Sequence, residues 1–104
     1  MKMGIKVVLE SENGEQIESF KDNKNVLHEI LPGIDDDNYC MVKYIDWYGD
    51  TVFNRLQAER LLLEVNNLNI DTNNIDHNDM IDKLRQLCER LNNEVHVYLK
   101  FYGD

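Results

Sequence analysis

One dipeptide, Asn13-Gly14, constrains the fold of this chain more than any other feature of its sequence. Residues 5–10 before it are rich in β-branched side chains, and residues 16–20 after it alternate apolar and polar. Asn-Gly between two such runs favours a tight hairpin turn, because both residues adopt positive φ readily. The chain is therefore predicted to begin with two antiparallel strands, which need further elements to bury one face.

Two later segments show helical periodicity instead. Residues 56–68 and residues 76–91 each place apolar side chains at spacings of three and four, which align on one stripe of a helix. The polar residues 69–74 between them are predicted to form a loop. We expect the two stripes to be buried against the sheet, with these residues in the core: Leu61, Leu62, Val65, Leu84, Leu87 and Leu91.

Two shorter patterns lie between the hairpin and the first long helix. Residues 22–31 predict a short helix, which Asn23 or Asn25 caps and Pro32 stops. Residues 39–45 lead through an apolar run and predict a third strand.

The end of the chain predicts the last strand, because residues 94–102 alternate apolar and polar side chains. One face of this strand is expected to meet the helices and carries Val95, Val97, Leu99 and Phe101. The other face is expected to be partly open and carries His96, Tyr98 and Tyr102.

The order strand-strand-(short helix)-strand-helix-helix-strand predicts an α+β fold. We expect a four-stranded, mostly antiparallel sheet with two long helices packed on one face, plus the short helix. A chain of 104 residues has room for one hydrophobic core, so residues 1–104 are predicted to form a single globular domain.

The chain is strongly acidic, with 20 acidic and 11 basic residues and a formal net charge of −9. Residues 10–37 alone hold nine acids and two bases. Such a surface would repel a phosphate backbone, which disfavours direct nucleic-acid binding, whereas it would attract a basic protein partner. The alternative is that the acidity serves only solubility.

The sequence predicts a cytoplasmic protein that does not bind a membrane. It contains no run of the ~20 apolar residues that a membrane span needs, and residues 1–5 lead into the first strand without the apolar core of a signal peptide. In that compartment Cys40 and Cys88 are predicted to be free thiols, with Cys88 as a small core residue of the second long helix.

No catalytic or metal-binding pattern is visible in the sequence. The five glycines are scattered, and none of the three histidines has a His or Cys partner at metal-ligand spacing. Residues 71–82 look superficially like a calcium loop, but Asp76 stands where that loop needs Gly and Asp82 where it needs Glu. We therefore expect no cofactor, no metal and no enzymatic activity.

Residues 44–57 gather large rings and charges, including the only Trp of the chain. We interpret this stretch as a strand-to-helix corner that forms a recognition surface, because Tyr and Trp are enriched at binding hot spots. In the alternative interpretation, Trp47 and Phe53 pack inward and the aspartates cap turns. The predicted partner contacts are Asp46, Trp47, Tyr48 and Asp50, with Asp35, Asp36 and Asp37 as a patch that attracts the partner by charge.

The same stretch carries a family resemblance. Its sequence, Tyr-Ile-Asp-Trp-Tyr-Gly-Asp-Thr-Val-Phe-Asn-Arg-Leu-Gln, resembles a segment of a family of small bacterial proteins. The family also opens with a strand similar to residues 4–10 and closes with Phe-x-Gly-Asp, as residues 101–104 do, but more often has Pro where Trp47 stands. Some small acidic proteins of this general kind look like immunity proteins, which neutralise a toxin delivered by a neighbouring bacterium. The resemblance assigns no functional residue.

Small size, acidity and the aromatic stretch, together with the resemblance, favour an immunity protein of a contact-dependent or polymorphic toxin system. It would bind and neutralise a cognate basic toxin domain. A nuclease is the favoured toxin, because an acidic protein can occupy a cleft built for phosphates. The alternative is a small-molecule-binding or regulatory module that uses the open face of the sheet. An enzyme with an unrecognised site is a third hypothesis, and the sequence leaves the oligomeric state open.

Overall fold

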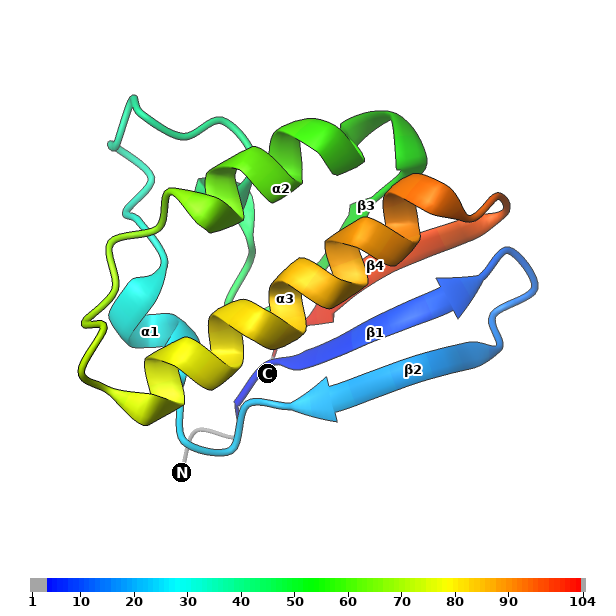
Figure 1. Cartoon of the computed structure of the whole chain (residues 1–104). Coiled ribbons are helices and arrows are strands. Elements are labelled where there is room, and N and C mark those ends of the chain that lie inside the picture. Colours follow the sequence, from blue (N-terminus) through cyan, green and yellow to red (C-terminus); the bar gives the residue numbers. More distant parts are fainter. Residues whose placement is uncertain (1–3, 104) are drawn as a thin grey trace.

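The computed structural model describes residues 4–103 and has the predicted α+β fold (Figure 1). The predicted hairpin joins β1 (Lys6–Ser11) to β2 (Gln16–Lys21) through residues 12–15, where Gly14 has a positive φ of 86° and Asn13 does not have a positive φ. β3 (Asp50–Phe53) and β4 (Val97–Tyr102) complete a four-stranded sheet. The strand order is β2-β1-β4-β3, and every neighbouring pair is antiparallel.

Two helices, α2 (Ala58–Asn66) and α3 (Ile75–Asn93), cover one face of the sheet (Figure 1). Their apolar stripes face the sheet as predicted, because apolar side chains spaced by three and four align on one side of each helix. Five of the six predicted stripe residues are buried, and the sixth, Leu62, is half-buried against the same core. The central strands contribute Val7, Leu9 and Leu99, so the core lies between the sheet and the helix pair.

The predicted short helix is present as α1 (Val26–Ile30), and Asn25, one of the two predicted caps, stands at its N-cap position, but the Asn25 side chain makes no capping hydrogen bond. The buried carboxylate of Asp22, and not Asn23 or Asn25, accepts hydrogen bonds at the start of the helix. Its donors are Val26 N at 2.9 Å and Leu27 N at 2.8 Å. Asn25 instead has a left-handed backbone with a φ of 54°, and this turn brings Asp22 to the free amides.

The predicted third strand at residues 39–45 is wrong. This segment contains only a short 3-10 helix, η1 (Val42–Tyr44), and the third strand lies later in the chain, at β3. The cause is Glu64 of α2, which is 2% exposed and accepts hydrogen bonds from three consecutive backbone amides. These donors are Cys40 N at 2.9 Å, Met41 N at 3.0 Å and Val42 N at 3.1 Å. Because the amides point at one carboxylate, they cannot alternate across a strand ladder.

The strand-to-helix corner also differs from the prediction. After η1 ends at Tyr44, residues 45–53 contain a turn and the whole of β3 before the next helix begins. The helical part starts at η2 (Arg55–Gln57), where Asn54 Oδ1 accepts from Leu56 N and Gln57 Oε1 accepts from Asn54 N. This reciprocal capping box leads directly into α2.

The last strand begins later than predicted, at Val97. His96 has a φ of 60°, which interrupts the extended backbone, and Val95 is consequently 60% exposed instead of facing the helices. From Val97 onward the predicted alternation holds, with Val97, Leu99 and Phe101 buried.

The face of the sheet opposite the helices is closed at its centre by its own side chains. Glu10 of β1 is buried and accepts hydrogen bonds from the Tyr102 hydroxyl and from Lys100 Nζ, the latter at 2.9 Å. These hydrogen bonds, from Tyr102 first and then Lys100, lower the pKa of Glu10. Val8, on the same face, is fully buried.

Candidate functional site

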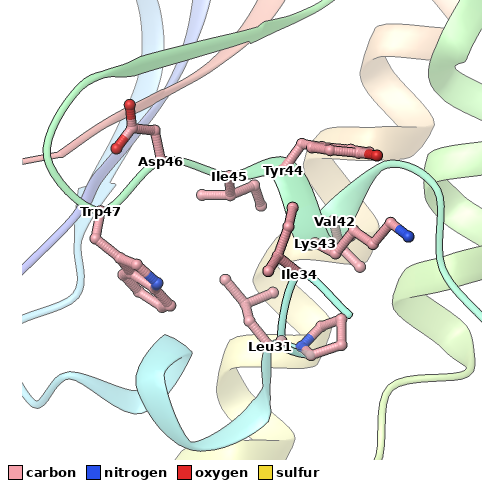
Figure 2. Close-up of a pocket in the computed structure, with 10 residues that line it drawn as sticks. Leu31, Ile34, Val42, Lys43, Tyr44, Ile45, Asp46 and Trp47 are labelled. Carbon is pink, nitrogen blue, oxygen red and sulfur yellow. The ribbon is translucent and has the colours of Figure 1, made fainter. Parts of the chain in front are cut away.

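A groove of about 430 Å³ lies between residues 31–34, which follow α1, and residues 42–47, which begin where Val42 N donates a hydrogen bond to Glu64. Leu31 and Ile34 lie on one side, and Ile45 and Trp47 face them from the other (Figure 2). The Asp46 carboxylate points away from this apolar lining (Figure 2). Other described residues that line the groove include Val42, Lys43 and Tyr44.

Glu64 fixes the wall of the groove that contains η1. Besides the three backbone amides, its carboxylate accepts from Arg60 Nε at 2.9 Å and from Cys40 Sγ at 3.1 Å. Burial disfavours the charged carboxylate, but the hydrogen bonds from Cys40, Arg60 and Val42 outweigh it and lower the pKa of Glu64 to about 2. Glu64 is therefore ionised at neutral pH, and its charged carboxylate accepts the hydrogen bonds from the backbone amides of residues 40–42.

Trp47 connects three parts of the molecule. Its ring stacks on His28 of α1, with the ring centroids 3.9 Å apart and the planes 5° from parallel. Gly103, just after β4, passes so close that a Cβ there would lie 2.4 Å from Trp47 O. The side chain is half-buried. Trp47 thus packs against the core, as in the inward-packing interpretation, while it also lines the groove.

Asp46 shapes the turn that follows Trp47. Its carboxylate accepts a hydrogen bond from Tyr48 N at 2.9 Å, and Asp46 N donates to Thr51 Oγ1 at 2.9 Å. The turn leaves Tyr48 74% exposed. Asp46 therefore has the turn-capping role of the alternative interpretation, and it presents a large aromatic side chain to solvent.

Asp50 and Phe53 lie at the two ends of β3 and have different environments. Asp50 is exposed and pairs with Tyr102 of β4. Phe53 is buried and meets Phe101 edge to face, with the ring centroids 5.9 Å apart. Phe53 is a core residue, whereas Asp50 remains accessible to a partner.

The predicted acidic patch lies in the loop directly after Ile34. Asp36 is half-buried, and its carboxylate accepts from Asn38 N at 3.0 Å, so this residue shapes the loop. Asp35 and Asp37 are exposed. Because Ile34 lines the groove and is 57% exposed, the acidic loop begins at the edge of the groove.

The structure therefore brings Trp47, a predicted contact, opposite the residue that directly precedes the predicted acidic patch. Ile34, which precedes Asp35, lies on one side, and Asp46-Trp47 lie on the other. Leu31, Ile34 and Glu64 were not identified from the sequence. Ile34 is an apolar residue isolated between Gly33 and three aspartates, and that isolation is the signal that could have indicated it.

Reactive side chains away from the groove have structural partners. The buried His77 places Nε2 2.7 Å from Glu29 Oε1, and its Nδ1 accepts from Asp71 N at 3.1 Å. Cys40 and Cys88 are free thiols, as predicted, and burial raises the pKa of Cys88 to about 12. Within residues 4–103, no three His, Cys, Asp or Glu side chains gather in a way that could hold a metal ion.

Over the same described residues, no helix has the length and apolar character needed to cross a bilayer. Comparisons of the chain with protein-family models, with curated proteins and with solved structures gave no match. The proposed function therefore depends on the site itself, and the resemblance of residues 44–57 remains a prediction.

Proposed function

We propose that this protein is an immunity protein that binds and neutralises a cognate basic toxin domain, without catalysis of its own. The observation that carries the proposal is the apolar groove between residues 31–34 and 42–47, each of which is continuous in the chain with an acidic segment, residues 35–37 and residues 46–50. Residues 31–50, which contain the groove and both segments, hold five acids and one base. Such a surface combines an apolar contact area with a charge that attracts basic proteins.

The exposed side chains in this region are large enough to supply binding energy. Ile34, Tyr44 and Tyr48 are all more than half exposed. Fully burying a side chain of this size contributes about 1.5–3 kcal/mol from apolar area alone, and Tyr is enriched among hot spots. Tyr48 stands on a turn fixed by Asp46, so little conformational freedom of the backbone is lost on binding.

A nuclease is the toxin class that this charge distribution suits best. Nucleases need basic clefts to hold phosphates, and an acidic surface with an aromatic anchor can occupy such a cleft. The alternative, a small-molecule site on the open sheet face, has less support. On that face Glu10 already accepts hydrogen bonds from Lys100 and Tyr102, and the Val8 side chain is fully buried.

Co-expression with candidate toxin domains encoded by the neighbouring genes tests the proposal. We expect the protein to restore growth and to co-purify with the toxin. Tyr48→Ala should raise the dissociation rate about 30-fold, which corresponds to a hot spot of ~2 kcal/mol. Leu56→Ala is the matched control, because Leu56 is 88% exposed but lies on η2, outside residues 31–50. A protein that neither restores growth nor co-purifies would refute the immunity function.

A further inference from the structure

We infer that the groove receives a large apolar side chain carried on a cationic segment of the protein partner, an inference that rests on the proposed function. The volume of about 430 Å³ lies in the range of roughly 300–1,000 Å³ that ligand clefts occupy. The occupant is therefore more than a single water or ion and can be one large side chain with its neighbouring backbone.

The apolar part of the occupant is indicated by the lining. Leu31, Ile34, Ile45 and Trp47 face one another across the groove (Figure 2). Ile34 remains more than half exposed in the free protein, although it is one of the largest apolar side chains on this surface. An apolar side chain seated between Ile34 and Trp47 would remove both from water, whereas a polar one would lose its hydration without compensation.

The cationic part is indicated by the surrounding charges. Asp46 is one of the lining residues, with its carboxylate pointing away from the apolar side chains, and Asp35 directly follows Ile34 on the other side. Lys43 is the one base among residues 31–50, and its Nζ lies 5.4 Å from the centre of the Tyr44 ring, an arrangement typical of a cation–π contact. Residues 31–50 together carry a net charge of −4, from five acids and one base, which favours Lys or Arg beside the apolar anchor and disfavours anionic metabolites.

The groove is held in place before the partner arrives. Glu64 binds the backbone amides of Cys40, Met41 and Val42 on one wall, and the Trp47–His28 stack joins that wall to α1. A preformed site loses less conformational entropy on binding than a flexible one. Even a short peptide with the right chemistry should therefore show measurable affinity.

Three tetrapeptides separate these requirements without the toxin. The first, acetyl-Arg-Leu-Phe-Arg-amide, has both features, acetyl-Glu-Leu-Phe-Glu-amide reverses the charge, and acetyl-Arg-Ser-Ser-Arg-amide removes the apolar anchor. Each is titrated into the ¹⁵N-labelled full chain and followed by two-dimensional NMR. The indole N–H of Trp47 gives a unique signal in the groove, because the chain has one Trp.

We expect the first peptide to shift the signals of residues 31–34 and 42–47 saturably at millimolar concentration. The two others should bind there at least tenfold more weakly, and the difference between the charged peptides should shrink in 1 M salt, where the Debye length is about 3 Å. Ile34→Ser should weaken the first peptide tenfold, whereas Leu56→Ser, an exposed apolar site elsewhere, should leave it unchanged.

Four results would overturn the inference. They are no saturable shift with the first peptide, equal binding of the acidic peptide, saturation centred on the open sheet face, and, in a fourth titration with neutral indole, tighter binding of indole than of the first peptide. The last of these would indicate a small-molecule site. Failure of the proposed function is distinguishable, because peptide binding without toxin rescue would refute the immunity function alone. Rescue without peptide binding would instead remove only the groove from the interface.

Discussion

Replacing Glu64 with Gln tests the feature that shapes both the fold and the groove. The substitution keeps the size of the side chain but converts one carboxylate oxygen to an amide donor. In the native protein, Oε1 accepts from Met41 N and Val42 N, and Oε2 accepts from Cys40 N, Cys40 Sγ and Arg60 Nε. Whichever way the introduced amide turns, its N–H₂ group faces at least two donors.

Two physical estimates of the cost agree. Leaving a buried donor unsatisfied costs about 1–3 kcal/mol, and two donors lose their acceptor, so the sum is roughly 2–6 kcal/mol. Independently, the lowering of the Glu64 pKa from 4.5 to about 2 corresponds to about 3 kcal/mol of stability at neutral pH. We therefore expect Glu64→Gln to lower the free energy of unfolding by about 3–5 kcal/mol and the Tm by about 12 °C or more.

The stabilisation that Glu64 provides should depend on pH. Because the folded-state pKa of Glu64 is depressed, its contribution is complete above pH 4.5 and is lost as the pH falls towards about 2. The difference in unfolding free energy between wild type and Glu64→Gln should therefore be largest at pH 7 and shrink steadily below pH 4.5.

Urea unfolding followed by far-ultraviolet circular dichroism at pH 7 and pH 3 measures both quantities. Glu89→Gln is the matched control, because Glu89 lies exposed on α3 and should change stability by less than about 0.5 kcal/mol. A loss below 1 kcal/mol for Glu64→Gln, or a loss that stays constant between the two pH values, would refute this account of residues 40–42.

Individual contacts elsewhere in the molecule lead to three more predictions. Asp22→Ala removes the carboxylate that caps α1 and should lower the free energy of unfolding by about 1–2 kcal/mol in urea titrations; a loss under 0.3 kcal/mol would contradict that capping role. Gly103→Ala places a Cβ 2.4 Å from Trp47 O, so the indole N–H signal of Trp47 should shift strongly, and an unchanged signal would show that this close approach does not occur. Replacing Asp35, Asp36 and Asp37 together with Asn should slow association with the toxin by roughly tenfold at low ionic strength and leave the dissociation rate nearly unchanged, whereas an unaltered association rate would show that the acidic loop serves only solubility.

The elements that the sequence predicted correctly are those specified by local pattern. The hairpin depends on Asn13-Gly14. The two long helices depend on stripes of apolar side chains, and these stripes determine which side of each helix is buried. The strand predicted at residues 39–45 failed because an apolar run of this length is ambiguous by itself. Glu64, more than twenty residues later, takes the amides that a strand would have used, and no local pattern records that contact.

The candidate site was predictable only in part, for the same reason. Trp47 and Asp46 were identified from their residue types, and both line the groove. The opposite side of the groove comes from Leu31 and Ile34, which tertiary packing brings near Trp47 through the His28 stack. Val95 was wrongly predicted to face the helices. The alternation of apolar and polar residues begins before Val97, but β4 does not, because His96 has a positive φ and is not extended.

The central claim is that the groove and its acidic edges form the surface that binds the toxin. An NMR titration of the ¹⁵N-labelled protein with the unlabelled toxin domain tests it most directly. We expect the largest signal changes within residues 31–50, including the Trp47 indole, while the sheet face that carries Glu10, Lys100 and Tyr102 changes little. Largest changes on that sheet face or along β2, with residues 31–50 unmoved, would contradict the claim.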